Sequence, residues 1–160
     1  MKTLIIYYSW SGWTRIVAAA LAKELGADIE EIRCGRYAPG FWGRIRAMVD
    51  GWQGHLPVIE PLSHLPSSYD LVAIGGPIWV FHPATPVRSL LRQQAAKLPK
   101  VAFFLTHGGS AAEQSLREMQ TLAGKVPAAS IVIRDNDIKN GSFVRALTSF
   151  AETLRGGKTG

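Results

Sequence analysis

The chain has 160 residues, of which 47% are hydrophobic and 19% are charged, and this composition excludes a disordered chain. Its formal net charge of +6 favours anionic partners, such as a nucleotide, a nucleic acid, a membrane surface or an acidic protein, without choosing among them. No apolar run approaches the roughly 20 residues of a membrane-spanning helix, so we expect no membrane span.

The first predicted elements are a strand, a loop and a helix. Leu4–Tyr8 is an apolar run of strand length, and Trp13–Leu25 has apolar residues at helical spacing. The loop Ser9–Thr14 between them leads into a helix N-terminus, which offers unpaired N–H groups and the positive end of a dipole. Its hydroxyls add donors, and Gly12 lets the backbone approach a ligand closely. This pattern predicts an anion site, although an ordinary helix cap explains it equally well, and the G-x-G-x-x-G fingerprint is missing.

The next segment joins a weak strand to a stretch rich in arginine and aromatic residues. Asp28–Arg33 carries acids between its isoleucines, so we assign it to a sheet edge. In residues 33–54 no acid precedes Asp50, and the basic and aromatic residues include Arg36, Tyr37, Phe41, Trp42, Arg44, Arg46 and Trp52. This composition is also typical of nucleic-acid surfaces, and another interpretation makes the segment part of a substrate or partner surface. We favour a third, in which a helix over about Phe41–Trp52 packs one apolar stripe on the sheet edge. The stripe would comprise Trp42, Ile45, Val49 and Trp52.

The third strand is predicted over Tyr69–Ile74 and is followed by the loop Gly75–Pro83 and a helix over Pro86–Leu98. Trp79 and Phe81 lie in that loop and would form a wall for a flat ligand. The alternative is that both aromatic side chains pack beneath the loop.

The fourth strand is predicted over Val101–Leu105, before the loop Thr106–Ser110 and a helix over Ala111–Ala123. Two glycines in this loop would expose backbone N–H groups to a polar ring edge, but a generic strand-to-helix turn explains them as well. His107 is either a redox-linked acid or a turn residue whose hydrogen bonds are satisfied.

The last elements are a strand over Ala129–Ile133 and a helix over Ser142–Leu154. The alternation of strands and helices predicts an α/β fold, a doubly wound five-stranded parallel sheet with ligands bound beyond the carboxyl ends of the strands. We expect one domain over residues 1–155 and a flexible tail over 156–160. The single cysteine, Cys34, can form no internal disulfide, which favours a reducing compartment and predicts the cytoplasm.

At the three loops the sequence resembles the flavodoxin family, specifically its short-chain flavodoxin-like proteins. The matching motifs are Ser9-x-Ser11-Gly12-x-Thr14, Gly76-Pro77-x-Trp79 and Thr106-His107-Gly108-Gly109. The resemblance spans nearly the whole chain. It implies the strand order 2-1-3-4-5 and FMN at the switch point between strands one and three, as in flavodoxin itself.

The resemblance also implies three groups of cofactor-binding residues. Those expected around the phosphate are Ser9, Trp10, Ser11, Gly12, Trp13 and Thr14. Those expected along one face of the flavin are Pro77, Ile78 and Trp79. Those expected at its other side and ring edge are Thr106, His107, Gly108 and Gly109.

Four features depart from the family pattern. Trp13 stands where members often have a small polar residue, and the third loop lacks the aromatic that commonly sandwiches the flavin. Val80 follows Trp79, where electron carriers have a glycine whose peptide flips on reduction. Because valine resists positive φ, we expect Val80 not to support that flip. The chain is also basic, whereas carrier flavodoxins are acidic.

These observations favour an FMN-dependent oxidoreductase that passes electrons from NAD(P)H or a protein donor to a small acceptor such as a quinone. The alternatives are a one-electron carrier for an acidic redox protein and a flavin-free binding or regulatory module on the same fold. We predict no metal ligands and no separate catalytic residue, since a flavin carries the redox chemistry itself. Nucleic acid is a less favoured partner, and the oligomeric state is left open.

Overall fold

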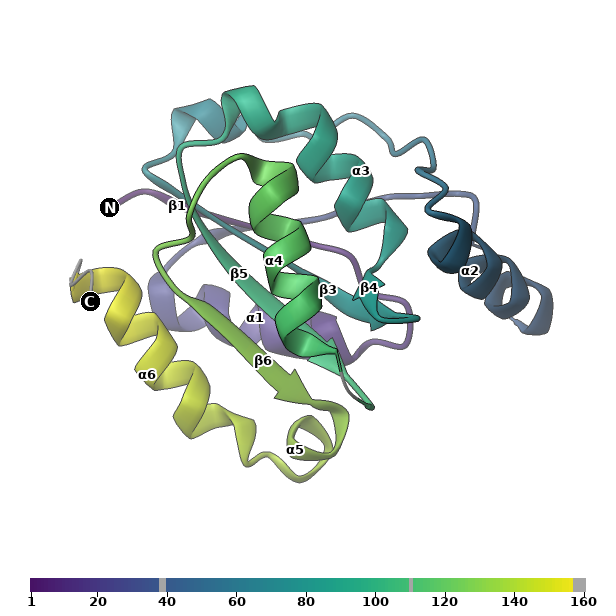
Figure 1. Cartoon of the computed structure of the whole chain (residues 1–160). Helices are drawn as coiled ribbons and strands as arrows, with labels where there is room; N and C mark the ends of the chain where they lie inside the picture. Colours follow the sequence, from purple (N-terminus) through teal and green to yellow (C-terminus); the bar gives the residue numbers. More distant parts are fainter. Residues whose placement is uncertain (38–39, 110, 157–160) are drawn as a thin grey trace.

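The computed structural model describes residues 1–37, 40–109 and 111–156 and shows a parallel sheet with helices on both faces (Figure 1). The strands are β1 (Thr3–Tyr7), β2 (Asp28–Glu31), β3 (Leu71–Trp79), β4 (His82–Pro83), β5 (Lys100–His107) and β6 (Ser130–Arg134). Five of them pair in parallel in the order β2-β1-β3-β5-β6, so the predicted doubly wound α/β fold is confirmed. The sheet has one strand more than the five expected, because the short β4 pairs antiparallel with β3.

Six α-helices within the described residues connect and follow the strands. They are α1 (Trp13–Leu25), α2 (Phe41–Gln53), α3 (Thr85–Gln94), α4 (Ala112–Ala123), α5 (Asp135–Asn140) and α6 (Phe143–Gly156). The sequence pattern did not predict α5. Gly26 and Gly124 end α1 and α4 in the left-handed conformation. Residues 157–160 of the predicted tail lie outside the described residues.

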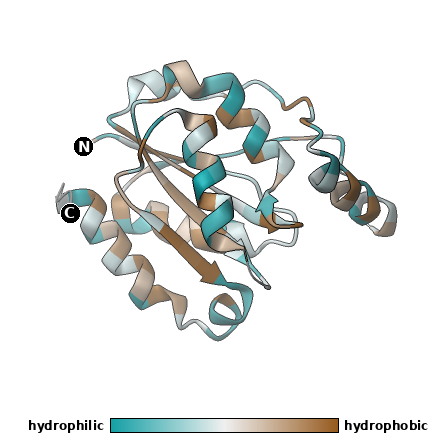
Figure 2. Cartoon of the chain, viewed as in Figure 1, coloured by the Kyte–Doolittle hydropathy of each residue, from teal (hydrophilic) through white to brown (hydrophobic). Residues whose placement is uncertain are grey.

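The sheet separates two apolar cores because alternate side chains of each strand point to opposite faces. Ile6 is in register with Ile74, and Ile74 with Phe103; all three are fully buried on the face covered by α3 and α4. Ile5 and Phe104 lie on the other face, beneath α1 and α6 (Figures 1 and 2). Both faces of the central strands are therefore buried, which explains their continuous apolar runs. None of the helices in the described ranges is long and apolar enough to cross a bilayer.

The segment expected as the loop Gly75–Pro83 is largely strand. β3 continues to Trp79, and its last residues pair with β5 up to the Pro77–Thr106 pair. Gly75 has no room for a side chain, because an added Cβ would overlap the ring of Phe104. An added Cβ at Gly76 would lie 2.5 Å from Val87 Cγ2 of α3. These glycines are thus required for packing within the sheet and beneath α3.

The expected packing of α2 is wrong. Trp42 and Trp52, predicted to face the sheet edge, are 78% and 77% exposed. The residues that α2 buries are Ala47, Asp50 and Gly51, on the opposite side of the helix. The reason lies in a polar network around Asp50, described below.

Candidate functional site

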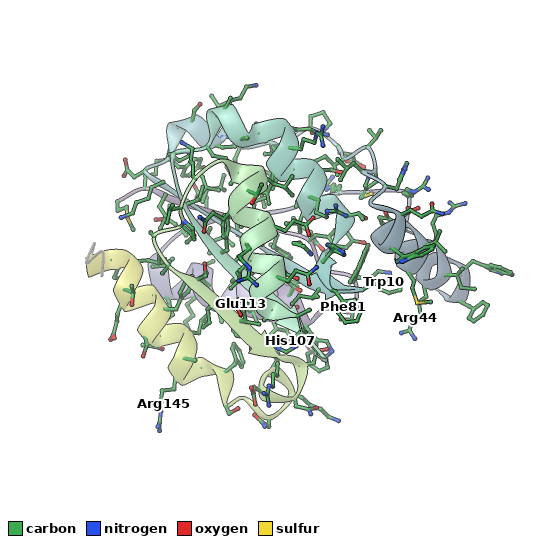
Figure 3. The ribbon with its side chains drawn as sticks, in the orientation of Figure 1. Trp10, Arg44, Phe81, His107, Glu113 and Arg145 are labelled. Carbon is green, nitrogen blue, oxygen red and sulfur yellow. The ribbon has the colours of Figure 1, made fainter. Side chains whose placement is uncertain are left out.

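The structure brings the three predicted loops together at the carboxyl edge of the sheet. A hydrogen bond of 2.8 Å joins the hydroxyls of Thr14 and Thr106, and therefore the first loop and the third. The rings of Trp10 and Trp79 lie 5.8 Å apart and join the first loop to the end of β3. Figure 3 shows Trp10 and Phe81 on the side of the molecule where β3 and β4 meet.

The Ser9–Thr14 loop presents a helix N-terminus. Gly12 has φ 98°, in the left-handed region that favours glycine, and α1 begins at the next residue. The Ser9 hydroxyl accepts a hydrogen bond of 3.3 Å from the Arg15 N–H, and Ser11 is exposed. The earlier N–H groups of α1 have no acceptor within the helix, and its first turn contains no acid. The loop can therefore bind an anion through backbone dipoles.

Trp13 is the unusual residue in this loop. Its half-buried side chain packs against the apolar core between the sheet and α6. Thr14 is buried and its hydroxyl contacts Thr106, so it orients the loop from below.

Trp79 and Phe81 behave differently from each other. The Trp79 ring packs edge-on against Tyr8, Trp10 and Tyr37, with centroid distances of 5.6, 5.8 and 5.1 Å. These contacts fix the orientation of the indole, which stays half-buried along with Pro77 and Ile78. Phe81, in contrast, is 58% exposed. The interpretation that both aromatics pack beneath the loop is therefore wrong for Phe81.

The expectation that Val80 avoids positive φ is also wrong. Val80 and Phe81 have φ values of 46° and 71° and form a two-residue turn between Trp79 and His82. The type I′ turn of a tight hairpin requires positive φ at both central residues, and here this requirement outweighs the preference of valine. The turn is held from outside, since the Ser115 hydroxyl donates to the Phe81 carbonyl at 3.1 Å. The strain is therefore imposed by the surrounding structure.

Val80→Asn is expected to stabilise the fold by about 1 kcal/mol, because asparagine tolerates the left-handed region better than a β-branched residue. Urea unfolding monitored by circular dichroism measures the change. Val58→Asn is the matched control, since Val58 is 87% exposed and does not have positive φ. A lower unfolding midpoint for Val80→Asn than for the unmodified chain would contradict a strained turn.

The third loop borders a polar cavity. Thr106 is buried, His107 ends β5, and Gly108 and Gly109 are exposed. The cavity has a volume of about 280 Å³ and is lined by His107, Gly108, Gly109, Arg134, Asp135 and Asn136. The Nδ1 atom of His107 is buried and has no hydrogen-bond partner among the described residues. Burial raises the pKa of Asp135, which lies at the start of α5. Ser110, at the end of the predicted loop, lies outside the described residues.

The sequence prediction missed the last three lining residues, Arg134, Asp135 and Asn136. Their position at the end of the last strand is a signal that could have found them. Arg134 ends β6, Asp135 and Asn136 follow it, and the carboxyl ends of parallel strands share one edge of the sheet.

A buried polar network attaches α2 beside the site. The Asp50 carboxylate is 3% exposed and accepts hydrogen bonds from Arg36 Nε at 2.5 Å and from the Tyr37 hydroxyl at 2.8 Å. Tyr37 also hydrogen-bonds Thr85 of α3 at 2.6 Å. Hydrogen bonds from Arg36 and Tyr37 hold the pKa of Asp50 below its usual range, while burial raises the pKa of Tyr37 to about 12. The network sets which side of α2 faces the protein.

Arg44 connects α2 to the first loop. Its guanidinium lies over the Trp10 ring, 5.6 Å from the centroid (Figure 3). A cationic side chain from α2 therefore reaches the loop that presents the N-terminus of α1.

No family model and no curated protein matches the sequence, but solved structures do. A flavoprotein from Lactobacillus acidophilus NCFM, solved in complex with FMN, has 28% identity and a TM-score of 0.71, over 88% of this chain and 98% of that one. The apo-form of the flavoprotein from Lactobacillus acidophilus NCFM has 30% identity and a TM-score of 0.65, over 86% and 95% of the two chains. The chain belongs to the flavodoxin-like flavoprotein family.

A flavodoxin from Streptococcus pneumoniae TIGR4 shares the fold at 14% identity, with a TM-score of 0.59 over 99% of this chain and 100% of that one. In this flavodoxin-like chain the strand order places the switch point between β1 and β3. Ser9–Thr14 and Trp79 lie at the carboxyl ends of those two strands. The joined loops thus occupy the position where doubly wound sheets bind ligands.

Proposed function

We propose that the chain binds FMN at the joined loops and acts as an oxidoreductase. It takes electrons from NAD(P)H or a protein donor and passes them to a small acceptor such as a quinone. The observation that carries this proposal is the Thr14–Thr106 hydrogen bond, which holds the first and third loops as one surface. The flavoprotein of Lactobacillus acidophilus in complex with FMN supports the choice of cofactor.

The residues at the edge suit the charge of FMN and the polar edge of its ring. The phosphate would lie at the N-terminus of α1, held by backbone N–H groups and the hydroxyls of Ser9 and Ser11, with Arg44 nearby. The flavin would lie along Pro77–Trp79 and meet Thr106–Gly109 at its ring edge. The buried Nδ1 of His107, which has no hydrogen-bond partner in the part of the chain that the structure describes, offers a polar contact there. When bound, FMN would supply the redox chemistry, and the protein would orient it and exclude water.

The geometry of the Val80–Phe81 turn favours an enzyme over a one-electron carrier. A carrier's peptide flip needs a mobile position after the tryptophan. Here β4 pairing, the Ser115 hydrogen bond and packing of Gly51 against Trp79 hold the turn on three sides. The net charge of +6 suits attraction of an anionic nicotinamide cofactor. We place the protein in the cytoplasm, in keeping with its single, half-buried Cys34.

Visible absorbance of the purified protein tests the cofactor. We expect a flavin spectrum, and an apoprotein that takes up FMN at one molecule per chain. Reductive titration should then pass directly from the oxidised to the fully reduced spectrum. A third spectrum at half-reduction would favour the carrier, and absence of FMN uptake would favour a flavin-free binding module.

A further inference from the structure

Helix α2 exposes an apolar surface on the side facing away from the protein. The helix projects from the body of the molecule, and Figure 2 shows hydrophobic residues along it. Its exposed large apolar residues are Phe41, Trp42, Met48, Val49 and Trp52. Phe41 is 69% exposed, close to the values for the two tryptophans, so three large aromatic side chains lie in solvent on one short helix. A cluster of this kind marks an interaction surface.

The outward residues form one stripe flanked by arginines. At 3.6 residues per turn, Phe41, Ile45, Met48 and Trp52 project within about 60° of one another, and Trp42 and Val49 widen the stripe to roughly 120°. Arg44 projects beside one border of the stripe and Arg46 beside the other. The first and last aromatic residues are separated by about 16 Å along the axis. This is the pattern of a helix that lies flat in a membrane interface.

The buried network keeps the stripe outward. Asp50 projects from the opposite side of α2 and is hydrogen-bonded to Arg36 and Tyr37. Turning the stripe toward the sheet would break these bonds and leave a carboxylate in solvent and an arginine without its partner. The exposure of the aromatic side chains is therefore a built feature of the fold.

A groove along the same helix adds a place for an anionic head group. It has a volume of about 460 Å³, and its lining includes Trp42, Ile45, Arg46 and Val49. An arginine beside apolar walls matches a lipid phosphate with its attached acyl chain. Asp50, also in the lining, is already paired with Arg36.

We propose that this outward face of α2 binds the surface of an anionic lipid membrane, with the helix parallel to the bilayer. The aromatic side chains enter the interface, and Arg46 contacts lipid phosphates. A second copy of the chain fits poorly, because pairing two such faces would bring their arginines and two net charges of +6 together.

Flotation with lipid vesicles tests the proposal. The unmodified chain should bind vesicles of equal parts phosphatidylglycerol and phosphatidylcholine, bind pure phosphatidylcholine about tenfold less, and dissociate at high salt. The double variant Trp42→Ser with Trp52→Ser and the variant Arg46→Glu should each lose at least about tenfold in binding. The matched control is Val144→Ser with Arg145→Glu on α6, where Val144 is also exposed, and it should bind normally.

Circular dichroism of each variant shows that it is folded, which the exposure of the substituted residues leads us to expect. Binding that the tryptophan and arginine variants retain would overturn the proposal. So would sedimentation of the unmodified chain as a dimer that Trp42→Ser with Trp52→Ser dissociates, because the face would then join two copies. Failure of FMN uptake would leave these outcomes unaffected.

Discussion

Ser11→Glu is expected to abolish FMN binding while leaving the fold intact. Ser11 is exposed in the loop before α1, so the new carboxylate has room and is itself stabilised by the positive end of the helix dipole. It would occupy the region proposed for the phosphate and repel it. Close like charges cost several kcal/mol, which is more than about a hundredfold in affinity.

Titration of apoprotein with FMN, followed by quenching of flavin fluorescence, measures this loss. Riboflavin serves as the ligand without a phosphate, and its affinity should fall much less. Ser67→Glu is the control, because Ser67 is an exposed residue before β3, at the opposite edge of the sheet. Unchanged FMN affinity in Ser11→Glu would show that this loop does not hold the phosphate.

Gly75→Ala is expected to destabilise the protein by about 3 kcal/mol or more, a large fraction of a domain's stability. The added methyl would overlap three atoms of the Phe104 ring, which is fully buried and in register with Gly75 on the neighbouring strand. Neither β3 nor β5 can shift to make room, because each is hydrogen-bonded to a neighbouring strand on both sides. Urea unfolding measures the loss.

Gly35→Ala is the control for the glycine substitution itself, because an added Cβ there meets nothing within 4 Å. Adding Phe104→Leu to Gly75→Ala should recover part of the stability, since the smaller side chain leaves space for the methyl. If Gly75→Ala were as stable as the unmodified chain, the close packing of Phe104 over this position would be wrong.

Local patterns predicted most of the fold because each central strand is a continuous apolar run and each long helix has a clear period. They failed at residues 75–83, where glycine and proline usually indicate a loop. The glycines are explained by Phe104 and Val87, which are distant in sequence. The local sequence of residues 75–83 therefore does not show that these glycines are needed to make room for side chains of a neighbouring strand and helix.

The candidate site shows the same limit. The three loops were predicted because helix N-termini and glycine-rich strand ends have local signals. The conformation of Val80 is set by the pairing of β3 with β4. The orientation of α2 is set by the Asp50 carboxylate, which accepts a hydrogen bond from Tyr37, and Tyr37 is also hydrogen-bonded to Thr85. An apolar stripe in the sequence shows that a helix has one apolar face. Whether that face is turned toward the core or toward solvent depends on the contacts of the buried residues on the other side of the helix.

The attachment of α2 depends on proton concentration. Because Arg36 and Tyr37 lower the pKa of Asp50, its ionised form stabilises the folded chain above the ordinary carboxylate pKa. That contribution disappears as the pH falls through the lowered value in the folded state. Protonation would remove the counter-charge of Arg36 and loosen the tether of the helix. Lowering the pH is therefore expected to loosen the attachment of α2 to the protein through protonation of Asp50.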